Sequence, residues 1–409
     1  MLADPLGPAK LGPLTLRNRV IKAATYEHAA RRGEVTDALV DFHVRQAAGG
    51  VAMTTVAYCA VEPGGRTDGH QIVWSDEAMP GLRRLTEAVH VEGAAISAQI
   101  GHSGPVGDRW ATGVQAVGPS RYFSKQGMAF ARPATTADIS RIVGLHGKAA
   151  AMAADAGFDA VEVHLGHNYL VSSFLSPRLN RRKDGYGGVL ANRARLAREV
   201  MHAVRDAVGD RIAVLAKLNL DDGVSGGFWI DESIQVAQWL EHDLTVDALE
   251  LSCGSSLLNP MYLFRGQAPI AEFAAAMPAA MRPAVRVVGP RLLKEYPYKD
   301  AFLLDDARQV REAVDLPLVL LGGVTSMDVI DRAMAEGFEY VAMARALLRE
   351  PDLVNRMQAD RGHRSLCNHN NRCMATTFKR TRCVLVPEGE ETPPAQREGR
   401  TVRPSSLPT

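Results

Sequence analysis

The sequence predicts a (β/α)8 barrel, an α/β fold of the TIM-barrel type, followed by a C-terminal extension. Short apolar segments alternate with helical segments, and eight such pairs fit into the first 360 residues. This alternation is typical of a parallel sheet covered by helices, and eight units predict closure into a barrel. The alternative is an open doubly wound sheet, which calls for a glycine-rich fingerprint after its first strand. Lys22-Ala23-Ala24-Thr25 is not such a fingerprint.

The predicted strands are short runs rich in valine, isoleucine, leucine and alanine, which suit strands buried on both faces. They lie at 18–24, 51–57, 94–100, the start of 160–170, 212–218, 248–253, 316–321 and 340–344. Between and after them, apolar residues recur at helical spacing. The predicted helices lie at 37–49, 78–91, 136–156, 192–208, 231–243, 303–314, 326–336 and 346–359.

Glycine marks several of the helix ends, because it readily adopts the left-handed conformation that terminates a helix. Gly49, Gly157 and Gly337 stand at three such ends. Two long segments are predicted to be irregular: 101–132, which is rich in glycine, proline and serine, and 254–300, which holds several prolines. Both are expected to line the pocket at the mouth of the barrel.

Composition excludes several classes of protein. The chain has 409 residues, and its 47 basic residues nearly balance its 46 acidic ones, so no basic field for nucleic acid or a membrane surface is expected. No apolar run reaches transmembrane length, and the N-terminus does not resemble a signal peptide. Five cysteines, an odd number in a long chain, argue against a disulfide framework and favour a cytoplasmic location. The oligomeric state stays open, and a homo-oligomer is compatible with the sequence.

Residues at the ends of the last two strands indicate a phosphate site. Loops after the seventh and eighth strands form the usual phosphate site of such barrels. Gly322-Gly323 leaves backbone N–H groups unshielded, and Arg345 offers a planar fork that suits phosphate. Ala344 stands beside Arg345 at the same strand end. The alternative is that the glycines form an ordinary turn and that Arg345 lies on the surface.

Two further polar residues end apolar strands. Gln99 can both donate to and accept from a flat heterocycle. Lys217 is a cation in an apolar strand, which is costly unless it pairs with a ligand or an acid of a neighbouring loop. Gln99, Lys217 and the expected phosphate pocket together predict a phosphorylated ring cofactor that lies across the mouth of the barrel.

The fourth strand leads into a cluster of polar rings, His164, His167 and Tyr169. Two imidazoles and a phenol can polarise an oxygen and deliver a proton. One alternative is a metal half-site, but Leu165 follows His164, so the metalloprotease pattern H-E-x-x-H is absent. Another is a structural role for the Tyr169 phenol.

From Leu11 to Cys383 the chain resembles the Old Yellow Enzyme family of FMN-dependent ene-reductases, in particular its bacterial NADH:flavin oxidoreductase branch. The most specific segment runs from Glu162 through Tyr169 to Asn192-Arg193. It includes the blocks Phe174-Leu175-Ser176-Pro177, Asn180-Arg181-Arg182 and Gly185-Tyr186-Gly187-Gly188. Trp74-Ser75-Asp76, Gln99-Ile100-Gly101-His102 and Leu321-Gly322-Gly323 are further matches.

The resemblance implies a role for each matching residue. His164 and His167 would bind the substrate oxygen over the flavin, and Tyr169 would donate the proton. Gln99 would pair with the pyrimidine edge of the flavin, and Lys217 would lie near its N1 and O2. The phosphate would be held by Gly322, Gly323, Ala344 and Arg345, and the ring would be flanked by Ala24, Thr25 and Tyr58.

The implied function is hydride transfer from NAD(P)H through FMN to the C=C bond of a small α,β-unsaturated carbonyl compound. The alternatives are an amine dehydrogenase or N-demethylase on the same scaffold, and a non-catalytic FMN-binding redox protein that uses Cys367 and Cys373. The sequence does not choose between NADPH and NADH.

The chain departs from larger family members after the barrel. Those members hold a [4Fe–4S] cluster with four cysteines, whereas here Asn370 replaces the second, leaving Cys367, Cys373 and Cys383. Clusters of this type want four thiolates, so the cluster is expected to be lost. We therefore expect an FMN-binding barrel at 1–360, a remnant cysteine segment at 361–385, and a flexible tail or arm at 386–409.

Overall fold

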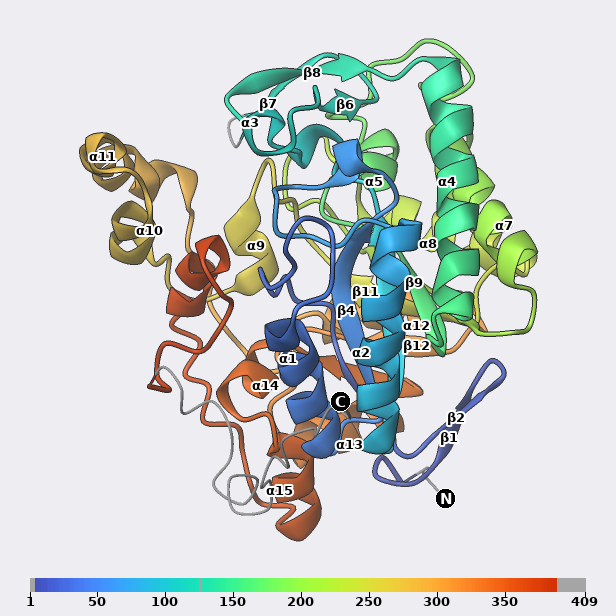
Figure 1. The fold of residues 1–409 in the computed structure, drawn as a ribbon, viewed down its shortest axis with the longest axis vertical. Coiled ribbons are helices and arrows are strands. Elements are labelled where there is room, and N and C mark those ends of the chain that lie inside the picture. Colours follow the sequence, from blue (N-terminus) through green and yellow to red (C-terminus); the bar gives the residue numbers. More distant parts are fainter. Residues whose placement is uncertain (1–3, 125–126, 388–409) are drawn as a thin grey trace, which may run out of the picture.

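The computed structural model describes residues 4–124 and 127–387 and contains a closed barrel of eight parallel strands, which confirms the predicted fold class (Figure 1). The strands follow one another around the barrel in chain order and close by pairing of the last with the first. They are β3 (Val20–Lys22), β4 (Met53–Ala60), β5 (Ala95–Gly101), β9 (Ala160–Leu165), β10 (Ala213–Asn219), β11 (Ala248–Ser252), β12 (Leu318–Leu320) and β13 (Tyr340–Met343).

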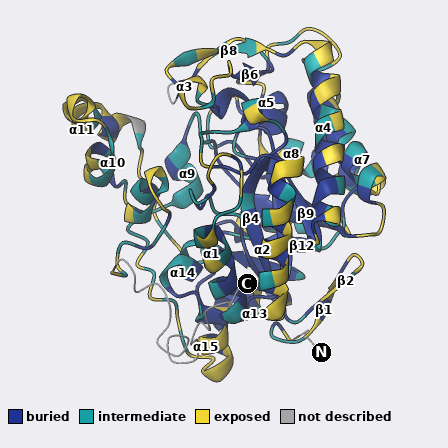
Figure 2. Ribbon diagram, in the orientation of Figure 1, coloured by how far each residue is buried: buried dark blue, intermediate teal, exposed yellow. Residues whose placement is uncertain are grey.

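The predicted helices surround this barrel, because each turns an apolar stripe toward the strands. They are α1 (Asp37–Ala48), α2 (Met79–Val91), α4 (Thr136–Asp155), α6 (Leu190–Arg193), α7 (Arg195–Val208), α8 (Ile230–His242), α12 (Leu304–Arg311), α13 (Met327–Ala335), α14 (Arg345–Arg349) and α15 (Leu353–Ala359). Two predicted helices are each divided in two, the one at 192–208 into α6 and α7 and the one at 346–359 into α14 and α15. Buried residues fill the centre of the molecule, and exposed residues follow the outer faces of helices such as α4 (Figure 2).

An N-terminal hairpin closes the end of the barrel opposite the site. It consists of β1 (Ala9–Leu11) and β2 (Leu14–Leu16). Leu11 and Leu16 are buried against residues of the strands, among them Met53 and Leu215. The site must therefore open at the other end, where the strands reach their carboxyl termini.

Both segments predicted to be irregular contain regular structure, so that prediction was wrong. Segment 101–132 forms η3 (Gly104–Val106), α3 (Arg109–Thr112) and a small sheet of β6 (Val117–Gly118), β7 (Tyr122–Ser124) and β8 (Ala129–Pro133). Segment 254–300 forms α9 (Pro260–Phe264), α10 (Ile270–Ala276), η4 (Ala279–Met281) and α11 (Arg282–Leu292). Pro260 and Pro283 occupy the first turns of α9 and α11, where a missing N–H costs nothing. Prolines that read as breakers therefore mark helix starts.

A short helix, α5 (Leu170–Leu175), directly follows the polar rings, and η5 (Arg372–Phe378) lies in the C-terminal extension. α10 packs against η5, so the insertion at 254–300 and the extension support each other (Figure 1). Most of the predicted tail, 388–409, lies outside the described residues. No helix in the described ranges is both long and apolar enough to cross a membrane.

Candidate active site

His164, His167 and Tyr169 lie together at the carboxyl end of β9. The rings of His164 and Tyr169 stack with centroids 4.5 Å apart, and those of His164 and His167 meet edge to face at 5.1 Å. His167 and Asn168 adopt positive φ angles of 59° and 58°, which turn the chain sharply between strand and helix. The turn is what brings the three rings to one side.

Both histidines are neutral at physiological pH. Burial, followed by the neighbouring His167 and Lys217, lowers the pKa of His164 well below its usual value. Burial and Lys217 lower the pKa of His167 to about 3. The N–H of Gly166 donates to Nδ1 of His164 at 3.2 Å, so in the neutral ring the proton is on Nε2. His164 is thus a hydrogen-bond donor without a charge.

Tyr169 stays protonated, because burial and the nearby Asp68 carboxylate raise the pKa of its phenol to about 12. Its ring meets the edge of Tyr58 with centroids 5.4 Å apart. Tyr58 in turn donates its hydroxyl proton to the carbonyl of Gly65. A buried, protonated phenol beside two neutral imidazoles can supply a proton.

Two partners that position His167 were not predicted. Its Nε2 lies 2.7 Å from Oγ of Ser252, at the end of β11, and its backbone N–H donates to Oδ1 of Asn219, at the end of β10. Sequence position alone could have suggested them, since both are polar residues that end apolar strands. Their pairing with His167 depends on strand order around the barrel.

Gln99, Glu162, Lys217 and Glu250 form a buried polar chain across four adjacent strands. Lys217 pairs with Glu162 at 3.2 Å and with Glu250, and Gln99 donates to Glu162. These side chains are at most about 3% exposed, so the ion pairs are not screened by water. The alternative considered for Lys217, pairing with a loop acid, was wrong in its location, because both partners lie on strands. Burial raises the pKa of Glu250, and the acids raise that of Lys217 against the effect of burial.

A cavity of about 150 Å³ opens beside these residues at the carboxyl ends of the strands. Its lining includes seven of the predicted site residues: Ala24, His167, Lys217, Gly322, Gly323, Ala344 and Arg345. Residues that were not predicted complete the wall: Leu263 and Phe264 of α9, Phe302 and Leu303, and His369 of the extension. Of these, Leu263 and Phe264 belong to the segment 254–300, whose helices were not predicted.

The end of the cavity near β12 and β13 fits an anion. Gly322 and Gly323 have φ angles of +99° and +80°, and a Cβ on Gly323 would lie 2.8 Å from the N atom of Ala301. Only glycine fits there. Within the described ranges, no acceptor receives a hydrogen bond from the backbone N–H of Gly323 or Arg345. The Arg345 guanidinium donates to Asn371 and, at 2.6 Å, to the carbonyl of Phe264, so its fork is held in place.

The remaining predicted residues lie around this cavity without lining it. Thr25 donates its hydroxyl proton to the carbonyl of Ala23 at 3.0 Å. Gln99, Tyr58, His164 and Tyr169 are likewise outside its lining, although the ring of His164 meets that of His167, which lines the cavity. An apolar slot with glycine turns and free N–H groups at one end fits a flat ring that carries a phosphate.

The three C-terminal cysteines also lie together. Cys367, Cys373 and Cys383 line one small cavity with Asn370 and Arg345, and all are free thiols. The three cysteines of the C-terminal motif are therefore also close together in space, beside the anion end of the larger cavity.

The known proteins that this chain resembles are oxidoreductases. Residues 6–256 match the model of the NADH:flavin oxidoreductase / NADH oxidase family. The chain is 52% identical over 378 residues to 4,4'-dithiodibutanoate disulfide reductase of Rhodococcus erythropolis, covering 92% of this chain and 94% of that protein.

Among solved structures, the 2-naphthoyl-CoA reductase complex with 2-naphthoyl-CoA superposes with a TM-score of 0.82 at 25% identity, covering 96% of this chain and 58% of that one. An old yellow enzyme homologue from Zymomonas mobilis superposes with a TM-score of 0.72 at 22% identity, covering 96% and 99% of the two chains. These matches confirm the predicted family resemblance. The chain belongs to the NADH:flavin oxidoreductase / NADH oxidase family and is an oxidoreductase of the Old Yellow Enzyme type.

Proposed function

We propose that this protein reduces the C=C bond of small α,β-unsaturated carbonyl compounds with hydride taken from NAD(P)H through FMN. The observation that carries the proposal is the cluster of His164, His167 and Tyr169, two neutral imidazoles and a protonated phenol at one strand end. A protein that only binds flavin needs no such proton donor.

FMN would be held with its phosphate at Gly322, Gly323, Ala344 and Arg345 and its ring beside Ala24 and Lys217. When bound, it supplies the hydride chemistry, while the protein supplies position and electrostatics. Lys217, kept charged by Glu162 and Glu250, offers positive potential to the ring. Gln99 and Tyr58 would then lie near the cofactor as part of the supporting wall.

The two imidazoles would bind the carbonyl oxygen of the acceptor. Nε2–H of His164 is one donor, and Nδ1–H of His167 is the other when the Ser252 hydroxyl donates to Nε2. Negative charge grows on that oxygen as the β-carbon accepts hydride, so donors already in position lower the barrier. Tyr169 then protonates the α-carbon as the general acid.

A second acceptor class is favoured by the relative that is named a disulfide reductase and is 52% identical over most of both chains. Hydride addition to one sulfur of an organic disulfide forms one thiol, breaks the S–S bond and releases a thiolate. Tyr169 can protonate that thiolate, so the same proton donor serves both reactions. The imidazoles would then face an electron-rich sulfur in place of an enolate oxygen.

Oxidation of an amine on this scaffold is the remaining alternative, and it differs in its electron donor. An amine dehydrogenase takes electrons from its substrate and needs no reduced nicotinamide. Rapid bleaching of the bound flavin by NADH or NADPH without oxygen supports the reductase proposal, and bleaching only by amines contradicts it.

The acceptor is tested with the reduced holoenzyme. It is mixed without oxygen with either 2-cyclohexenone or 4,4'-dithiodibutanoate, and flavin reoxidation and products are followed together. Fast formation of cyclohexanone supports ene reduction. Fast formation of the thiol with slow reaction of the enone supports the second acceptor class, and failure of both contradicts the proposal.

A further inference from the structure

A second group of polar side chains lies beside the barrel mouth, on the loops that follow β3 and β4. It consists of His28 from the first loop and Asp68 and His70 from the second. The loops leave adjacent parallel strands, so their residues meet above the same part of the rim. None of these three residues binds the acceptor or transfers a proton in the proposed reaction, although Asp68 lies near enough to Tyr169 to raise the pKa of its phenol.

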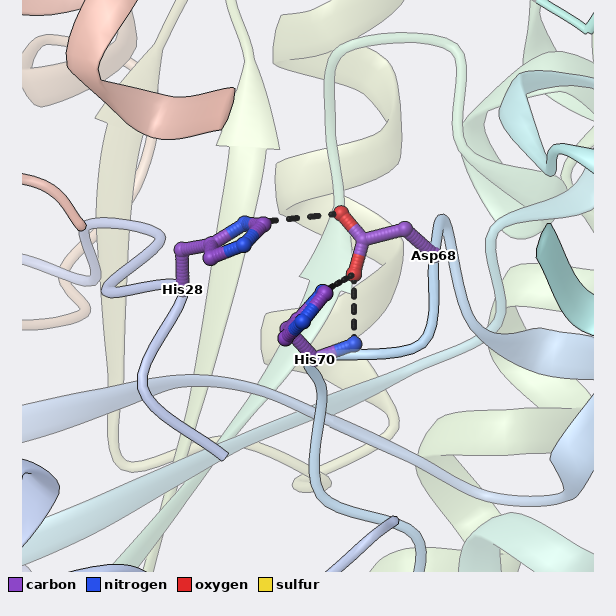
Figure 3. A group of neighbouring side chains, drawn as sticks. All are labelled: His28, Asp68 and His70. Carbon is purple, nitrogen blue, oxygen red and sulfur yellow. Dashed lines mark hydrogen bonds and ion pairs between the residues drawn. The ribbon is translucent and has the colours of Figure 1, made fainter. Parts of the chain in front are cut away.

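The three side chains converge on one point. Nδ1 of His28 lies 4.0 Å from one oxygen of Asp68, and Nδ1 of His70 lies 3.7 Å from the other. The two imidazoles stack with centroids 3.9 Å apart and planes inclined by 23°. Figure 3 shows both rings turned toward the carboxylate (Figure 3). One ligand atom from each residue lies within 4.8 Å of the others.

These distances are close to those of a tetrahedral metal site. Ligand atoms that each lie about 2.0–2.1 Å from a zinc ion are roughly 3.3 Å apart. The ligand atoms, which lie up to 4.8 Å apart, must therefore approach one another by up to about 1.5 Å, through rotation of the side chains. Two imidazoles and one carboxylate are also a ligand set that zinc uses, with a fourth position open to water or another group.

Further contacts already orient the ligands. The Tyr26 hydroxyl donates to the Asp68 carboxylate, 2.6 Å from both its oxygens, and also lies 3.2 Å from Nδ1 of His28. The backbone N–H of His70 donates to the same carboxylate at 2.7 Å. Thr377 of the C-terminal extension also lies near the His28 ring. Contacts of this kind fix the orientation of the carboxylate and of the His28 ring. The cluster is therefore supported from two loops and from the C-terminal extension.

We propose that His28, Asp68 and His70 form a binding site for a divalent transition-metal ion of the zinc class at the rim of the barrel. The Tyr26 hydroxyl, which lies beside both Asp68 and Nδ1 of His28, is placed to take the fourth position on the ion. The ion neutralises the charge of the Asp68 carboxylate. The two rings bind it as neutral imidazoles, so they add no positive charge of their own. It also ties together the loops after β3 and β4.

The test is titration of the holoenzyme with zinc ion after removal of bound metal with a chelator and removal of the chelator. One zinc per chain is expected to bind. His70→Gln is the first variant, because His70 is half exposed and its replacement leaves the core intact. It should weaken binding by more than about tenfold, since even changes to outer contacts of metal ligands cost about 10–100-fold. Asp68→Asn should act in the same direction.

Two control variants make the result specific. His90→Gln removes another partly exposed histidine that contacts an aspartate, and Cys367→Ser removes a thiol of the C-terminal group. Neither should change zinc binding at the rim. Anomalous scattering at the zinc edge should give a peak between His28, Asp68 and His70. Absence of saturable binding, unchanged binding in His70→Gln, or loss of it in Cys367→Ser overturns the proposal.

Discussion

At the scale of single residues, neutrality of the imidazoles decides what the site can do. A charged histidine beside Lys217 would add a second positive charge to a buried pocket, and burial prevents this. The imidazoles therefore act as preplaced dipoles, which stabilise a growing negative charge without first losing a proton. Tyr169 alone carries the transferable proton.

Replacing His164 tests this role directly. His164→Ala should slow reduction of 2-cyclohexenone by the reduced holoenzyme about 10²–10³-fold, the usual cost of losing one such donor. His164→Asn restores a neutral N–H donor and should recover part of the loss. Stopped-flow reoxidation measures both, and equal rates for the two variants would contradict a donor role.

The same residues predict a flat pH profile for reoxidation. The pKa of His167 is about 3 and that of Tyr169 about 12, so neither changes its protonation state between about pH 5 and 10. The reoxidation rate of the reduced holoenzyme should vary little across that range. A steep change near pH 6.5, the ordinary range of histidine, would contradict the neutral assignment.

Residue types at the site could be predicted from the sequence, but their partners could not. His164, His167 and Tyr169 form a local pattern that one segment carries. Ser252, Asn219 and Asp68 come from other strand ends or loops, and their approach depends on barrel closure. In the sequence, Glu162 and Glu250 are visible only as single charged residues in apolar strands. That Lys217 lies between them follows from the register of the strands.

At the scale of elements, strands β9, β10 and β11 share a network of buried charges that is surrounded by apolar side chains. Lys217→Met leaves two buried acids without their cation. The free energy of unfolding should fall by about 3–5 kcal/mol, measured as the shift in urea-induced unfolding of the holoenzyme. Lys299→Met removes an exposed lysine, 62% accessible, and should change stability by no more than about 1 kcal/mol. Equal shifts in the two variants would contradict the network's role.

The loop after β10 should make stability depend on pH through Asp221. Burial raises the pKa of its carboxyl to about 6, above the value of about 3.9 expected in the unfolded chain. The folded state therefore holds this proton more tightly, and the resulting stabilisation is present below about pH 4 and lost as pH rises through about 6. Asp221→Asn should flatten this part of the stability profile, and an unchanged slope between pH 4 and 6 would refute the assignment.

Long, periodic elements were the ones that could be predicted. The barrel strands and helices such as α4 contain enough apolar residues for the spacing of those residues to indicate a strand or a helix. The strands of the small sheet at 117–133 have two to five residues each, too few to show alternation. Their hydrogen-bond partners lie within the same insertion and are fixed by tertiary contacts.

At the scale of the whole molecule, barrel closure brings together what the chain separates. The anion end of the cavity comes from the loops after β12 and β13, and the polar rings come from β9, nearly half the chain earlier. The extension adds His369 to the cavity wall, so the segment after the barrel is part of the site. The proposed division at residue 360 stays a prediction, as does the loss of the iron–sulfur cluster.

The central claim is that the cluster at β9 serves the acceptor half of the reaction while flavin reduction proceeds without it. Anaerobic stopped-flow measurement of both half-reactions in Tyr169→Phe tests this most directly, with Tyr186→Phe as a control whose hydroxyl bonds Glu199 away from the cavity. We predict that NAD(P)H reduces the flavin of Tyr169→Phe at close to the normal rate, while 2-cyclohexenone reoxidises it about 10²–10⁴-fold more slowly. Normal reoxidation in Tyr169→Phe, or equal slowing of both half-reactions, would contradict the account.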